Sequence, residues 1–127
     1  MKRSVMLTIA SLLSILLLLF HLTDDLVRGI SQVGPLNLTI VPVLAGWLYG
    51  TLVLGERRSG YIVNLLGGII ALAMPVVHLS SAGPYNFLKT SGRFFFLWTL
   101  LTLGVTGLFS LILSVRGLRN PQWGQSR

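Results

Sequence analysis

The 127-residue sequence contains no cysteine and few charged side chains. Without cysteine, the chain cannot form a disulfide, bind zinc or an iron–sulfur cluster through thiolates, or use a thiol nucleophile. Only 10% of the residues are charged, whereas 53% are hydrophobic, and the mean hydropathy is +0.79. This composition lies far outside the range of soluble domains and is typical of a membrane protein.

Charged residues are absent from four long apolar segments, which are residues 5–22, 36–54, 61–79 and 94–115. Each reaches the ~17–25 residues that a helix needs to cross the hydrocarbon layer. We therefore predict an all-α integral membrane protein in which residues 1–127 form a single bundle of four transmembrane helices. Little chain remains outside these segments, which excludes a separate soluble catalytic or binding domain. The first segment also has the basic start and apolar run of a signal peptide, but no small-residue cleavage site follows it.

Acidic residues are scarce: the chain has three, against ten lysines and arginines, and its net charge is +7. If the four segments cross alternately, the basic residues divide seven to three between the two sides. The seven are Lys2, Arg3, Arg57, Arg58, Arg116, Arg119 and Arg127, and the three are Arg28, Lys89 and Arg93. The positive-inside rule then places both termini in the cytoplasm, as expected in a bacterial plasma membrane. The basic excess is thus explained by topology and contact with membrane lipids, not by nucleic-acid binding.

Two of the three acidic residues follow a histidine at the end of the first apolar segment. If the helix continues for one more turn, His21, Asp24 and Asp25 stand at positions i, i+3 and i+4 and share one face. The alternative is that Thr23 caps a new amphipathic helix over residues 24–33, in which case the aspartates complement the dipole of that helix.

The second half of the chain repeats parts of the first. His21-Leu22-Thr23 is matched by His78-Leu79-Ser80, and the Gly-Pro-x-Asn element containing Asn37 is matched by one containing Tyr85 and Asn86. Two parallel helical hairpins would account for this pattern and would place His21 and His78 at matching depths. We expect Asn37, Tyr85 and Asn86 to support the site.

The grouped histidines and aspartates suggest several kinds of chemistry. Imidazole and carboxylate are ligands that suit zinc, iron or copper, so His21, His78 and Asp24, together with Asp25, form a candidate site for a divalent metal. Two histidines could also hold a haem as axial ligands, or a His–Asp pair could relay protons. The remaining interpretation is that these groups lie in the headgroup layer and are solvated by water.

Small residues mark candidate packing faces in the second and third segments. They are Gly46 and Gly50, spaced as Gly-x-x-x-Gly, and Gly67, Gly68 and Ala71. Such residues let helix backbones approach closely, within one chain or between subunits. The pattern also predicts that the third helix is the most enclosed.

These features favour a binding or assembly subunit, either a homo-oligomer or part of a larger membrane complex, with a His/Asp site for a metal, haem or small ligand. A transporter or channel subunit is the first alternative, although no charge lies at mid-membrane. A metal-dependent enzyme acting on a lipid or quinone is the second. The chain lacks a serine or cysteine nucleophile motif, which disfavours an enzyme.

Overall fold

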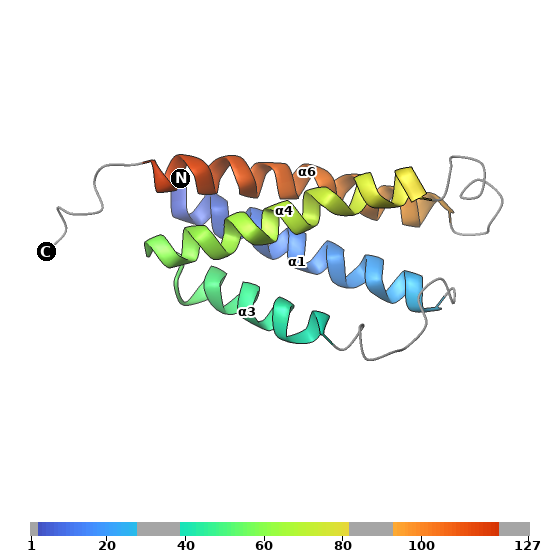
Figure 1. Cartoon of the computed structure of the whole chain (residues 1–127), viewed down its shortest axis with the longest axis horizontal. Helices are drawn as coiled ribbons and strands as arrows, with labels where there is room; N and C mark the ends of the chain where they lie inside the picture. Colours follow the sequence, from blue (N-terminus) through green and yellow to red (C-terminus); the bar gives the residue numbers. More distant parts are fainter. Residues whose placement is uncertain (1–2, 28–38, 82–92, 120–127) are drawn as a thin grey trace, which may run out of the picture.

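The structure, a computed structural model, describes residues 3–27, 39–81 and 93–119, and its regular secondary structure is entirely α-helical. Its helices are α1 (Arg3–Val27), α3 (Ile40–Leu52), α4 (Arg58–Ser81) and α6 (Arg93–Leu118). They run side by side with alternating directions, so that α1 begins and α6 ends at the same end of the bundle (Figure 1). The prediction of an all-helical chain with four helices is confirmed for this part of the protein.

Three of these helices, α1, α4 and α6, are long and apolar enough to span a membrane. The fourth, α3, has 13 residues and is therefore about 20 Å long at about 1.5 Å per residue. The hydrocarbon layer is about 30 Å thick. The predicted second segment began at residue 36, whereas α3 begins at Ile40, and residues 28–38 lie outside the described part. Pro42 lies in the first turn of α3, where a missing backbone N–H removes no helical hydrogen bond.

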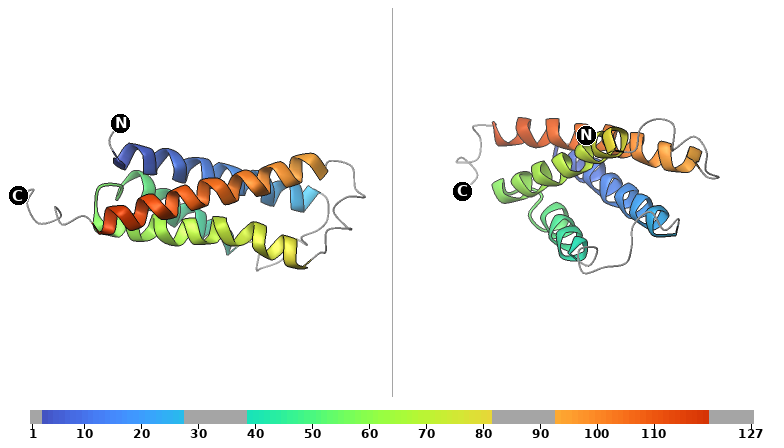
Figure 2. Two further views of the ribbon diagram at one scale, coloured as in Figure 1. Left: turned by 90° about the horizontal axis from the view of Figure 1, so that it is seen from above. Right: turned by 45° about the vertical axis from the view of Figure 1, so that its right-hand side comes forward.

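The most extensive helix pairing is between α4 and α6, and α6 also packs along α1. In the left view of Figure 2, α6 runs diagonally across these two helices. Glycines bring α4 and α6 together: a Cβ on Gly68 would lie 3.0 Å from the carbonyl oxygen of Gly107, and a Cβ on Gly107 would lie 2.7 Å from the Cβ atom of Ala71. Larger side chains would push the two backbones apart.

The shorter α3 packs against α4 and α1. A Cβ on Gly50 would collide with Val63 of α4, and one on Gly67 would collide with the Trp47 ring, whereas a Cβ on Gly46 would meet nothing within 4 Å. The expectation that the third helix is the most enclosed was wrong. The apolar window of α4 is 28% buried, against 44% for α1 and α6, because the 13-residue α3 covers only part of the 24-residue α4.

Residues 53–57 connect α3 to α4, and we call this connection the turn end of the bundle. Buried polar side chains join the helices near it. The hydroxyl groups of Ser11 and Thr51 are 2.8 Å apart, and the Thr51 hydroxyl lies 2.8 Å from Oδ1 of Asn64. These contacts tie α1, α3 and α4 together. Between α1 and α6, the Ser14 hydroxyl lies 2.9 Å from that of Thr106. Inter-helix hydrogen bonds of this kind stabilise bundles in membranes by about 0.6 kcal/mol on average.

Candidate metal site

The first helix continues without a break through both aspartates and ends at Val27. The hydroxyl of Thr23 donates a hydrogen bond of 2.7 Å to the carbonyl oxygen of Leu19, four residues earlier in the same helix. The alternative in which Thr23 caps a new helix was therefore wrong. Because the helix is continuous, His21 and Asp25 lie one turn apart on the same face.

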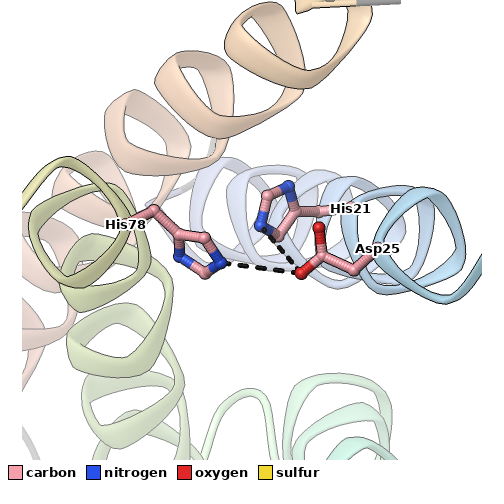
Figure 3. Close-up of side chains that lie close together, drawn as sticks. All are labelled: His21, Asp25 and His78. Atoms are coloured by element: carbon pink, nitrogen blue, oxygen red, sulfur yellow. Dashed lines mark ion pairs between the residues drawn. The ribbon is translucent and has the colours of Figure 1, made fainter. Parts of the chain in front are cut away.

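The opposite wall of the site is formed by His78 near the end of α4. The Nε2 atom of His21 lies 3.8 Å from Oδ2 of Asp25, and the Nε2 atom of His78 lies 3.5 Å from the same oxygen. Figure 3 shows both imidazole rings directed at this carboxylate. One ligand atom from each of the three residues falls within 4.8 Å of the other two. We call this group the His–Asp cluster (His21, Asp25 and His78).

The cluster is shielded from its surroundings by the bundle. His21 has an exposed fraction of 0% and Asp25 of 3%, and His78 is partly buried. Burying a carboxylate is costly unless a cation or hydrogen-bond donor compensates for its lost hydration. These side chains therefore do not fit the interpretation in which water of the headgroup layer solvates them freely.

A backbone hydrogen bond orients His78. Its Nδ1 atom lies 2.9 Å from the carbonyl oxygen of Met74, which can only accept a hydrogen bond, so Nδ1 carries the proton. In the neutral ring, Nε2 then carries a lone pair, and this lone pair faces the carboxylate of Asp25. Two acceptors face each other favourably only when a proton or a metal ion lies between them. A backbone carbonyl that fixes the histidine tautomer is also a common feature of metal sites.

Other polar atoms of the cluster have no hydrogen-bond partner in the described part of the chain. They are Nδ1 and Nε2 of His21 and Oδ1 of Asp25. Leaving a buried polar atom unpaired costs about 1–3 kcal/mol, and more for a charged group. A water molecule or an ion bound among the three side chains would supply the missing partners.

One neighbour of the cluster was not predicted from the sequence. The Phe96 ring is 2% exposed, and its centroid lies 4.9 Å from that of His21 and 5.8 Å from that of His78. Three consecutive phenylalanines suggest an aromatic belt at the membrane boundary. Phe94 agrees with this interpretation, because its side chain has an exposed fraction of 79%. Helical spacing could have distinguished Phe96, because it shares a face with the buried Leu100 and Leu103.

The other predicted site residues are not part of the three-ligand group. Asp24 is partly buried on α1, and it lies outside the set of atoms that converge near Asp25. Asn37, Tyr85 and Asn86 lie outside the described residues, so the structure places none of the supporting positions taken from the Gly-Pro-x-Asn repeat.

The cluster fits a metal ion better than a haem. Around a tetrahedral zinc ion, with bonds of about 2.0–2.1 Å, neighbouring ligand atoms lie about 3.3 Å apart. The two distances to Asp25, 3.8 and 3.5 Å, are close to this value, and the three ligand atoms lie within 4.8 Å of one another. A haem between two axial histidines needs a flat slot for the macrocycle, but the rings of His21 and His78 meet edge to face with centroids 4.8 Å apart. The arrangement therefore does not accommodate haem ligation by this pair.

Comparisons of the chain with protein-family models, with curated proteins and with solved structures found no match.

Proposed function

We propose that the protein is a small metal-binding membrane subunit in which His21, Asp25 and His78 hold a divalent transition metal. In this proposal the chain crosses the membrane four times and both termini lie in the cytoplasm. The convergence of three ligand atoms within 4.8 Å carries this proposal. Two imidazole nitrogens and a carboxylate oxygen suit zinc, iron or copper.

The bound metal would join two helices. His21 and Asp25 come from α1 and His78 comes from α4, whereas direct packing between these two helices is limited compared with the packing of each against α6. A metal ion shared by α1 and α4 would close the end of the bundle at which the cluster lies. Three protein ligands also leave a position for a water molecule, a small ligand or a side chain of a partner subunit.

The crossing count rests on the charge distribution and on the alternating directions of the helices. The described α3 is too short to span the hydrocarbon layer by itself, but the apolar sequence that precedes it extends the segment to residue 36. Basic residues at the turn end and at the end of α6 favour the cytoplasmic side for this end of the bundle.

Metal binding can be tested on protein purified in detergent without a histidine tag. A tag would itself bind metal and hide binding by the two histidines of the chain. We expect one zinc or cobalt ion per chain by elemental analysis after equilibration and removal of free metal. Cobalt in a site with two imidazoles and a carboxylate would also give visible absorption bands. His21→Ala and His78→Ala should each abolish the bands and the stoichiometric metal.

Loss of metal must be separated from loss of the fold. Far-ultraviolet circular dichroism and size-exclusion profiles of both variants should match those of the unchanged protein, because neither histidine takes part in the close approach of Gly68 and Ala71 to Gly107 between α4 and α6. Protein that binds no zinc, cobalt, iron or copper in stoichiometric amount would refute the proposal. So would variants that keep full metal content and unchanged cobalt bands.

A further inference from the structure

A groove of about 480 Å³ lies at the opposite end of the bundle from the His–Asp cluster. It runs between the first turns of α1, the end of α3 and the connection that follows. Its volume is within the range of about 300–1,000 Å³ that is typical of small-molecule sites. Two other grooves, of about 220 and 290 Å³, have almost entirely apolar walls, whereas this groove combines apolar walls with charged and hydroxyl-bearing residues.

The apolar walls come from two helices. Val5 and Ile9 of α1 stand on one side, and Leu52 and Val53 lie on the other at the end of α3. All four side chains are exposed. In a helix that crosses a membrane, exposed apolar side chains face the acyl chains of lipids. An acyl chain in the groove would therefore contact the same kind of apolar surface that lipids contact elsewhere on the bundle.

Thr51 also lines the groove, and its buried hydroxyl is held in place by the contacts with Ser11 and Asn64. Arg57 also lines the groove and is exposed. The neighbouring Glu56 also lines the groove and is exposed. A guanidinium group presents several hydrogen-bond donors that match the oxygen atoms of a phosphate.

Positive charge predominates at this end of the bundle. Arg58 begins α4, and Arg116 and Arg119 lie at the end of α6, against the single carboxylate of Glu56 in the described part of this end. Basic residues near a membrane surface attract anionic lipids, and basic pockets between transmembrane helices bind their headgroups.

We propose that this groove is a binding site for one anionic phospholipid. Arg57 contacts the phosphate, and Val5, Ile9, Leu52 and Val53 contact the start of an acyl chain. The site joins α1 to the connection between α3 and α4, and it is independent of the metal at the other end.

Native mass spectrometry in a neutral detergent can measure the binding of phosphatidylglycerol. Phosphatidylcholine, which has no net charge, tests whether an anionic headgroup is required. Glycerol 3-phosphate tests whether an acyl chain is required. We expect one phosphatidylglycerol to bind more tightly than either comparator. Arg57→Gln should weaken its binding about fivefold, which is the factor corresponding to about 1 kcal/mol per basic residue near a membrane surface.

Two further variants separate a specific site from general attraction. Arg119→Gln removes the same charge at the same end but outside the groove, and it should weaken the affinity much less than Arg57→Gln does. Val5→Trp should lower the affinity for both lipids by filling the groove, since Val5 is exposed and its replacement does not disturb the core. Equal weakening by Arg57→Gln and Arg119→Gln, no effect of Arg57→Gln, or binding of glycerol 3-phosphate as tight as that of the lipid would each overturn the proposal.

Discussion

Asp24 and Asp25 are neighbours in the sequence, but they have different surroundings. Asp25 is 3% exposed and lies within 4 Å of both histidines, whereas Asp24 is partly buried and lies outside the converging set. This difference follows from the rotation of about 100° between successive residues of a helix. The pair therefore provides a matched test of the cluster with the same chemical change at adjacent positions.

Asp25→Asn should weaken cobalt binding by more than the 10–100-fold that loss of a supporting residue typically causes at metal sites. The amide is neutral and a much poorer ligand than the carboxylate, while its size is nearly the same. Asp24→Asn should leave the affinity nearly unchanged. Titration of the cobalt absorption bands measures both affinities, and a larger loss in Asp24→Asn would show that the wrong aspartate has been assigned to the metal.

The positions of the individual residues in the His–Asp cluster could be predicted from the sequence only in part. The positions i and i+4 of His21 and Asp25 follow from helical geometry, and the depth of His78 follows from the matching ends of the apolar segments. The contact of His78 with the carbonyl oxygen of Met74 lies within α4 and depends on the rotamer of the histidine. The position of the Phe96 ring against both histidines depends on how α4 and α6 are rotated about their axes. Apolar composition on all sides of a helix does not reveal that rotation.

Helix packing depends on where each glycine faces. Gly107 of α6 faces Gly68 and Ala71 of α4 at backbone contact distance, whereas Gly46 of α3 has open space around its Cα atom. The sequence analysis identified Gly46 by its Gly-x-x-x-Gly spacing and did not identify Gly107. Spacing within one helix shows that a close approach is allowed, but the neighbouring helix decides which glycine is approached.

Gly107→Leu should destabilise the bundle by about 1–3 kcal/mol or more, because the new side chain must displace the backbone of α4. Gly46→Leu should leave the stability of a single chain unchanged or slightly raised, since leucine favours helix more than glycine does. Thermal unfolding in detergent, followed by circular dichroism, measures both effects. A fall in melting temperature for Gly46→Leu equal to that for Gly107→Leu would contradict the assignment of the α4–α6 interface.

The same pair of variants addresses assembly. If two copies of the chain contact each other through the open face of α3, Gly46→Leu should shift the protein from oligomer to monomer without loss of helix content. If the protein is a monomer in mild detergent before and after the substitution, the small residue at position 46 contacts lipid or a different protein. Multi-angle light scattering distinguishes these outcomes.

The arrangement of the whole molecule explains how residues 57 positions apart in the sequence form one cluster. Alternating helix directions place the end of α1 and the end of α4 at the same end of the bundle (Figure 1). The sequence analysis inferred four segments that cross alternately, and the charge distribution then predicted which side faces the cytoplasm. It did not predict that α3 begins as late as Ile40, because apolar composition shows where a helix can lie in a membrane but not where its first turn begins.

Single cysteines test the proposed topology cleanly, since the natural chain contains none. Cysteines at positions 2 and 119, beside the beginning of α1 and at the end of α6, should react with a membrane-impermeant maleimide only when the cytoplasmic face is accessible. Ser59→Cys, at the start of α4, should behave in the same way, and Ser80→Cys, at its other end, should react from the opposite face. Labelling of positions 2 and 119 from different faces would mean an odd number of crossings. That result would contradict the arrangement in which α1 begins and α6 ends at the same end of the bundle, and with it the assignment of the basic turn end to the cytoplasm.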